Sequence, residues 1–402
     1  MATLSNGQPE ETDPIISRKP WRALAAYWFL GLCNNYGYVV MLSAANDILH
    51  EQTETVDNFA NQTSVRNPDR ECNYISTGAI LLADILPALF IKMISPFLPF
   101  FVHVRVAICV ILAASGYILV AFSNRQWMAI AGVVLTSFCS GLGEATFLQY
   151  SSFFDKNVIS TWSSGTGGAG VAGALSYAAL NALGLRTALL IMLIVPITMA
   201  VAFWIILPKP TNFTPQVEIE SPKSSLKFKE KLALLPYLLR FMIPLGLVYL
   251  FEYFINQGMY ELINFEDTFI DKDEQYRWLQ VDYQVGVFIS RSSVNVFHIK
   301  KIWLMSVFQF VNVILFTTEA IFYYIPNLWI ILALTFWEGL LGGAAYVNTF
   351  YKISEETPEQ NREFSLGITS FSDSVGISLA GIFAILVHNS ICGLPKPHRR
   401  IV

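Results

Sequence analysis

The chain has 402 residues, of which 54% are hydrophobic and only 14% are charged. A soluble domain carries about 25% charged residues, so this composition excludes an ordinary water-soluble protein. Uncharged or nearly uncharged stretches of roughly 20 residues recur from Ala23 to Cys392, and each is long enough to cross a bilayer as a helix. The formal net charge of −4 gives no indication of a nucleic-acid partner. The sequence therefore predicts an all-α polytopic membrane protein.

Residues 1–20 are polar and are predicted to form a cytosolic tail. No apolar segment precedes the basic residues at the end of this tail, so a cleavable signal peptide is not expected. Glu11, Ile15 and Ile16 match the spacing of an acidic dileucine signal. Sorting adaptors read such signals as an address to endosomes and lysosomes, which makes adaptors expected partners.

The N-terminal half, residues 21–207, is predicted to form a lobe of six transmembrane helices. Their ranges are 24–42, 75–96, 104–122, 127–150, 159–183 and 187–207. The polar loop at 47–74 contains Asn61 in the sequon Asn-Gln-Thr, so this loop is predicted to be lumenal or extracellular and glycosylated. Residues 208–236 are rich in lysine, proline and serine and are predicted to form a cytosolic linker.

The C-terminal half, residues 237–391, is predicted to form a lobe of five helices, followed by a tail at 392–402. The helix ranges are 237–258, 275–290, 302–324, 328–351 and 364–389. Lysine and arginine are more frequent on the side of the N-terminus, which favours a cytosolic N-terminus. An odd number of helices places the basic C-terminal tail in the lumen, against the same rule. The sequence leaves the side of that tail open.

One uncharged helix combines many small residues. Ser164, Gly168 and Ala172 recur at every fourth position and share one helix face. Small residues on such a face let another helix approach closely in lipid. The glycine-rich run 165–170 also matches the dinucleotide pattern G-x-G-x-x-G, but no strand precedes it and no acidic residue follows at the required spacing. Helix packing is the prediction.

The same small-residue pattern returns 208 residues later, where Gly376 and Ala380 take the places of Gly168 and Ala172. A second echo, at an offset of 199, matches the stretch SGLGEATFLQY around Gly143 to the stretch LLGGAAYVNTF around Gly342, and Lys92 to Arg291. Parallel repeats of about six helices form the two lobes of major-facilitator transporters, with a substrate cavity between them. The chain is therefore predicted to be a major-facilitator-like two-lobe bundle of about 11 helices, six plus five.

Ionisable groups inside a span are costly to bury, so a functional role is their default hypothesis. The candidates for contact with a substrate or a coupled proton are Glu144, Glu252, Tyr253, Asn256, Glu338, Asn348 and Asn35. A structural hydrogen bond to a neighbouring helix is the alternative for each. Asp84, Lys92 and Arg291 are predicted as gating residues, with the cations pairing to acids such as Asp84. The alternative is that Lys92 and Arg291 extend to the membrane surface.

Enzyme motifs are missing from the sequence. There is no G-x-S-x-G, no H-E-x-x-H and no phosphate-binding G-x-x-x-x-G-K-[ST], and the histidines are scattered. The cysteines and histidines show no metal-ligand spacing. We therefore expect neither catalysis, nor a metal, nor a cofactor.

Long blocks of the chain resemble the battenin family over about residues 23–391. These blocks include FLGLCNNYGYVVMLSAANDIL, WSSGTGGAGVAGALSY, EYFINQG, GVFISRSS and SDSVGISLAG. The resemblance implies a late endosomal and lysosomal membrane protein of major-facilitator type that is needed to clear glycerophosphodiesters such as glycerophosphocholine. It also implies a link to lysosomal pH, trafficking and autophagy. The alternative is a non-transporting membrane scaffold that recruits trafficking factors.

Overall fold

The computed structural model describes residues 20–53, 77–181, 183–210, 227–265, 268, 270 and 272–397. Within these residues the chain is helical and contains no strand. The predicted sorting signal at Glu11, Ile15 and Ile16 and the predicted glycosylation site at Asn61 lie outside them, as does most of the predicted loop at 47–74.

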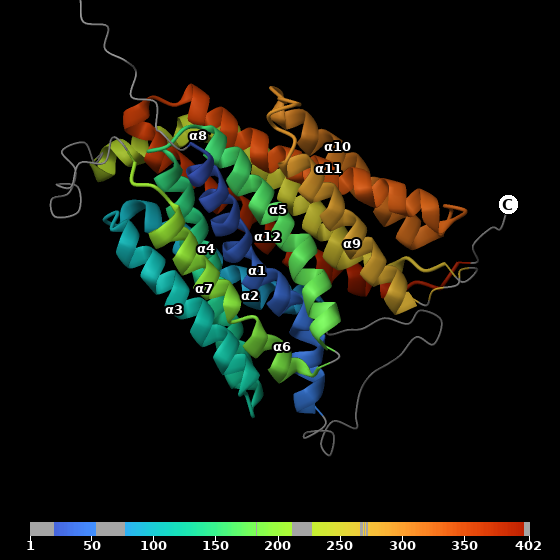
Figure 1. The fold of residues 1–402 in the computed structure, drawn as a ribbon. Coiled ribbons are helices and arrows are strands. Elements are labelled where there is room, and N and C mark those ends of the chain that lie inside the picture. The colour runs from blue at the N-terminus through green and yellow to red at the C-terminus, as the bar shows by residue number, and fades with distance from the viewer. Residues whose placement is uncertain are drawn as a thin grey trace, which may run out of the picture.

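The N-terminal half forms a bundle of six membrane segments (Figure 1). The first five are α1 (Pro20–Thr53), α2 (Thr77–Ile94), α3 (Val102–Ala121), α4 (Gln126–Ser151) and α5 (Asn157–Asn181). The sixth is composite and consists of α6 (Leu185–Ile191), α7 (Ile194–Val201) and a π-helical turn at Ala202–Ile206. In Figure 1, α3 and α7 lie on the flank of the molecule opposite α10.

The C-terminal half supplies five segments. They are α8 (Phe228–Phe254), α9 (Lys272–Arg291), α10 (Ile302–Phe322), α11 (Leu328–Glu356) and α12 (Glu359–Cys392). A π-helical turn at Ile255–Met259 and a 3-10 turn at Tyr260–Leu262 extend α8. The predicted six-plus-five arrangement is confirmed.

Two predicted boundaries differ from the structure. α1 continues to Thr53, so the predicted polar loop begins with helix, and α8 begins at Phe228, inside the predicted linker. Both extensions contain charged residues, such as Lys229 and Lys231 in α8, and the predictions followed uncharged runs. A helix can continue past the apolar layer because its backbone hydrogen bonds do not depend on lipid.

The two halves repeat the same packing. α1 packs against α5 as α8 packs against α12, and α2 packs against α4 as α9 packs against α11. Across the boundary between the halves, α2 contacts α12 and α5 contacts α9, which are equivalent pairs in the repeat. The composite segment α6–α7 has no counterpart among the described residues of the C-terminal half.

Glycines permit the closest helix contacts in each half. A Cβ atom at Gly165 of α5 would collide with the carbonyl oxygen of Trp28 on α1, and one at Gly376 of α12 would collide with that of Gly246 on α8. A Cβ atom at Gly168 would instead lie 3.5 Å from Phe288, an ordinary contact distance. Gly168 thus packs at van der Waals distance from α1 and α9, while the closer approach to α1 falls at Gly165, three residues earlier, because the crossing of the helices selects that point.

The other predicted packing residues lie near these crossings. Ser164 accepts a hydrogen bond from Trp28 Nε1 at 3.2 Å and lies 2.9 Å from the Ser292 hydroxyl, so it links α5 to α1 and to the end of α9. Ala172 is half-buried against the core of the N-terminal half, and Ala380 is fully buried in α12.

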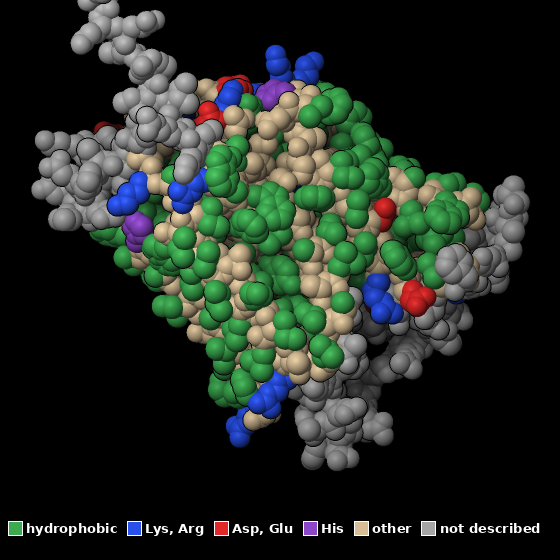
Figure 2. Space-filling view, viewed as in Figure 1, with side chains coloured by type: hydrophobic (Ala, Val, Ile, Leu, Met, Phe, Trp, Pro, Cys, Tyr) green, Lys and Arg blue, Asp and Glu red, His purple; other side chains and the backbone are tan. Residues whose placement is uncertain are grey.

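The outer surface suits a lipid environment. Seven of the described helices are long and apolar enough to cross a membrane. Figure 2 shows a face dominated by hydrophobic side chains, with charged side chains near its margins. Exposed apolar residues on the flanking helices include Ile108 and Ile111 of α3 and Phe310 and Ile314 of α10. Such a surface is stable in contact with hydrocarbon.

The halves also meet at the end of the bundle where α4 and α11 finish. Lys156, just beyond α4, forms an ion pair with Glu355 of α11 at 2.5 Å. The ring of Phe97 packs against those of Phe228 and Phe364, at centroid distances of 5.5 and 5.4 Å. These contacts join the two halves at this end of the bundle.

The cysteines among the described residues lie within helices or at a helix end. Cys33, Cys109 and Cys139 are buried free thiols in the N-terminal half. Cys392, the last residue of α12, is disulfide-bonded.

Candidate functional site between the two halves

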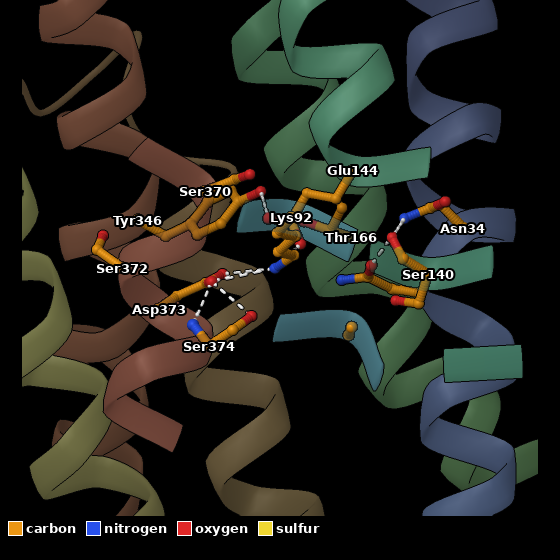
Figure 3. Close-up of polar contacts among 12 residues, drawn as sticks. Asn34, Lys92, Ser140, Glu144, Thr166, Tyr346, Ser370, Ser372, Asp373 and Ser374 are labelled. Atoms are coloured by element: carbon orange, nitrogen blue, oxygen red, sulfur yellow. Dashed lines mark hydrogen bonds and ion pairs between the residues drawn. The ribbon is translucent and has the colours of Figure 1, made fainter. Parts of the chain in front are cut away.

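Three charged side chains from three helices meet at the boundary between the halves (Figure 3). Lys92 Nζ of α2 lies 2.6 Å from Glu144 Oε2 of α4 and 3.0 Å from Asp373 Oδ1 of α12. The three side chains are only 5–7% exposed. Charges attract strongly where water is excluded, so Lys92 joins a carboxylate from each half.

Neutral donors complete the coordination of these carboxylates. The Tyr346 hydroxyl of α11 donates to Glu144 Oε1 at 2.6 Å and accepts a hydrogen bond from Trp162 Nε1 of α5 at 3.1 Å. The hydroxyl of Ser374 donates to Asp373 Oδ1 at 3.1 Å. A buried charge is tolerated only when paired and hydrogen-bonded, and this cluster meets both conditions.

Arg291, the last residue of α9, is the second buried cation at this boundary. Its guanidinium donates to Thr166 Oγ1 of α5 at 2.6 Å and to the Tyr249 hydroxyl of α8 at 2.7 Å. The guanidinium carbon lies 4.2 Å from the centre of the Tyr346 ring, in cation–π geometry. No carboxylate of the described residues forms an ion pair with Arg291, and its Nε has no hydrogen-bond partner.

Lys92 and Arg291 are related by the repeat offset, and each reaches across to the other half. They are only 4% and 9% exposed, which excludes the alternative that they extend to the membrane surface. The structure thus places both predicted gating cations in the interior of the bundle, where they hold the halves together.

Asp84 is not the partner of Lys92, so that part of the predicted gate is wrong. Asp84 is fully buried on α2, and neither of its carboxylate oxygens has a hydrogen-bond partner. The two residues are eight positions apart on one helix, a separation of about 12 Å along its axis, so their side chains do not meet.

Glu252 and Glu338 lie apart from this cluster, within the C-terminal half. Glu252 of α8 accepts a hydrogen bond from the Tyr283 hydroxyl of α9 and lies against Gly342 of α11. Glu338 of α11 accepts a hydrogen bond from the Tyr260 hydroxyl at 2.8 Å. Sequence reasoning grouped both with Glu144, but only Glu144 reaches the boundary cluster.

Tyr253 and Asn256 follow Glu252 on the same segment. The half-buried ring of Tyr253 stacks on that of Tyr249 at a centroid distance of 6.1 Å, which extends the aromatic surface beside Arg291. Asn256 is buried in the π-helical turn, its carbonyl accepts a hydrogen bond from Gln280, and its side-chain oxygen has no partner. Tyr253 therefore joins the boundary site, and Asn256 lies with the C-terminal carboxylates.

The remaining two predicted amides have structural contacts. Asn348 Oδ1 accepts a hydrogen bond from the backbone N–H of Ile299 at 2.7 Å, and Asn348 Nδ2 donates to the carbonyl of Ala344. Asn35 is half-buried and accepts a hydrogen bond from Asn34 at 3.4 Å. Neither side chain contacts the charged cluster, so the alternative of a structural hydrogen bond describes both.

Relatives of known sequence identify the family. A family model described as CLN3 protein matches residues 25–225 and 214–394. The chain belongs to the CLN3 protein family. Battenin of the dog is 42% identical over 97% of this chain and 98% of its own length. Protein BTN1 of Yarrowia lipolytica is 36% identical, over 92% of this chain and 94% of its own length. The predicted resemblance to the battenin family is confirmed.

Solved structures show the fold of this CLN3-family protein to be of major-facilitator type. The human organic anion transporter MFSD10 superposes with a TM-score of 0.63 at 12% identity, covering 94% of this chain and 96% of its own. A D-xylose–proton symporter superposes with a TM-score of 0.59 at 11% identity, covering 91% and 90%. At such low identity the similarity concerns the fold alone.

Sequence reasoning missed several residues of the boundary site. Asp373 passes the test that selected Glu144, since it is a carboxylate within a long apolar helix, and that test could have found it. Tyr346, Trp162 and Thr166 give no such signal, because aromatic and hydroxyl side chains are common in membrane helices. Within the described residues, no group of three or more acidic, histidine or cysteine side chains could hold a metal ion.

Proposed function

We propose that this CLN3-family protein transports a zwitterionic organic phosphate, a glycerophosphodiester of the glycerophosphocholine type, out of late endosomes and lysosomes. The observation that supports this is Arg291, a buried guanidinium at the boundary between the halves whose hydrogen-bond and ring partners are all neutral. Guanidinium groups bind phosphate oxygens in a bidentate manner. A phosphate can replace the hydroxyls of Thr166 and Tyr249 without breaking an ion pair.

The same site offers a place for a quaternary ammonium group. Tyr249, Tyr253 and Tyr346 pack ring to ring, with centroid distances of 6.1 and 6.4 Å. Aromatic faces bind quaternary ammonium groups through the cation–π interaction. The ring of Tyr346 contacts the Arg291 guanidinium, and its hydroxyl donates to Glu144. A single side chain therefore contacts both a cation and a carboxylate of the site. This arrangement suits a zwitterion.

The fold that this chain shares with solved transporters supports transport of a small molecule. The two solved neighbours are named as an organic anion transporter and a sugar–proton symporter.

The acidic dileucine pattern at Glu11–Ile16 supports delivery to endosomes and lysosomes with a cytosolic N-terminus. A second sequon, Asn212-Phe-Thr, lies in the linker that is predicted to be cytosolic. This orientation predicts that Asn61→Gln removes a glycan and that Asn212→Gln does not. A gel shift lost only in the Asn212 variant would contradict it.

Uptake of labelled glycerophosphocholine by proteoliposomes that contain the purified protein tests the proposal. Arg291→Gln should lower uptake at least tenfold, because a hydrogen bond to a charged group contributes about 1.5–3 kcal/mol. Arg291→Lys should lose less, and Lys301→Gln, an exposed cation at the start of α10, should resemble wild type. Full uptake by Arg291→Gln would overturn the assignment of Arg291. Wild-type protein that moves nothing would favour the non-transporting scaffold.

A further inference from the structure

We propose that Glu252 and Glu338 form a proton-binding site inside the C-terminal half, separate from the cluster around Lys92, and that this proton is coupled to transport. Proton binding stands on the geometry of the two carboxyl groups. Its coupling to substrate movement rests on the proposed function. The site therefore adds a co-transported ion to the organic phosphate.

In each of the two carboxyl groups, one oxygen accepts a hydrogen bond and the other has no hydrogen-bond partner. Glu252 accepts from Tyr283 and Glu338 accepts from Tyr260, so one oxygen of each has a hydroxyl donor from another helical segment. The second oxygens, Glu252 Oε2 and Glu338 Oε1, are buried and have no hydrogen-bond partner. Glu252 is 2% exposed and Glu338 is fully buried. An unpartnered carboxylate oxygen is expensive in such a place unless it binds a proton.

The two groups are neighbours in space. The carboxylate of Glu252 lies against Gly342, which follows Glu338 by one helical turn on α11. Their negative charges repel one another. Two carboxylates that share a buried site do not both ionise, so one proton is the simplest means of relieving the repulsion.

The charged and titratable groups around this pair act on it at a distance, without an ion pair among the described residues. The groups that interact electrostatically with Glu252 come from four segments. They are Tyr249 and Tyr253 of α8, Tyr260 of the 3-10 turn, Tyr283 and Arg291 of α9, and Glu338 of α11. On α12, Asp373 pairs with Lys92 and His388 bonds the carbonyl of Gly258, and on α10 Glu319 accepts from the N–H of Ile325. No described lysine or arginine forms an ion pair with Glu252 or Glu338.

The backbone next to Glu252 is irregular. The π-helical turn Ile255–Met259 follows directly, and such turns are frequent at functional sites. It contains Asn256, four residues after Glu252, whose buried side-chain oxygen has no partner. This oxygen is an available acceptor for a carboxylic acid O–H on the same side of the segment.

Infrared spectra of the purified protein test proton binding without any transport. At neutral pH, wild type should show a carbonyl band of a protonated carboxylic acid that weakens in Glu252→Gln and in Glu338→Gln. The control is Glu355→Gln, a carboxylate of the same half that is 36% exposed and forms an ion pair with Lys156, and it should keep the band. If a Gln variant does not fold, Glu338→Asp is measured in its place. This variant retains an ionisable group and should keep the band. An unchanged band in both Gln variants would overturn the proton site.

Flux measurements then test the coupling. Wild-type proteoliposomes should take up glycerophosphocholine several-fold faster with a proton gradient than without one, and either Gln variant should lose this acceleration. Uptake in the Gln variants that keeps the full response to the gradient would refute the coupling. A wild type that shows the infrared band but no flux would support the proton site and overturn the proposed transport function, so the two failures are distinct.

Discussion

Lys92 and Arg291 occupy equivalent positions in the two halves, yet only Lys92 forms ion pairs with carboxylates. Lys92 holds Glu144 and Asp373, whereas Arg291 is held by hydroxyl groups and a tyrosine ring. By the repeat offsets, the position equivalent to Glu144 is Gly343, and the position equivalent to Asp373 is Gly165. Two acid-to-glycine differences therefore separate a cation with two carboxylate partners from a cation that forms no ion pair among the described residues.

Helix packing maintains this difference. A Cβ atom at Gly343 would collide with Ser290, and one at Gly165 would collide with the backbone of Trp28. Neither position has room for a carboxylate side chain. Both halves thus keep the same backbone arrangement, and the close contacts at these two glycines exclude acidic side chains there. As a result, the carboxylates lie beside Lys92 and have no equivalent beside Arg291.

The largest expected effect compares the two cations by deletion. Lys92→Ala leaves two buried carboxylates without their cation and should lower stability by about 3–5 kcal/mol. Arg291→Ala leaves only neutral groups and should lower it by about 1–3 kcal/mol. Thermal unfolding in detergent measures both. The combination of Lys92→Met with Glu144→Gln and Asp373→Asn should recover much of the loss, and equal effects of the two single deletions would contradict the comparison.

A second prediction compares the glycines of the two halves. Gly165→Ala and Gly376→Ala each push a methyl group into the backbone of a neighbouring helix and should cost about 1–3 kcal/mol of stability. Gly168→Ala is the matched control, because its Cβ atom meets the Phe288 ring at an ordinary distance. It should be neutral or slightly stabilising, since alanine favours helix over glycine. Unfolding temperatures that fall equally in all three would show that the crossing point has been misassigned.

The smallest expected effect concerns the exposed ion pair between the halves. Its side chains are 45% and 36% exposed, so Lys156→Gln should hardly change the melting temperature in physiological salt. Hydrogen bonding to Glu355 raises the pKa of Lys156. Any stability from the pair is therefore present at neutral pH and is lost as the pH rises through that raised pKa. A difference between wild type and variant that grows at alkaline pH would contradict this sign.

The class of protein, the order of its helices, its internal repeat and its family could all be predicted from the amino-acid sequence. Hydrophobic runs and small-residue spacing are local properties, and a membrane demands them wherever a helix crosses it. Lys92 and Arg291 were paired by the repeat alone. The predictions failed at helix ends such as Phe228, where charged residues continue a helix beyond the apolar layer.

The pairing of polar side chains between helices could not be predicted and became visible in the folded bundle. Lys92 and Asp373 are 281 positions apart, and no local pattern indicates that α2 and α12 face one another at those residues. The same applies to Arg291, which the sequence paired with an acid and the structure surrounds with Thr166, Tyr249 and Tyr346. Contacts between helices depend on crossing geometry and on the fit of particular side chains, and these properties arise only when the whole bundle has packed.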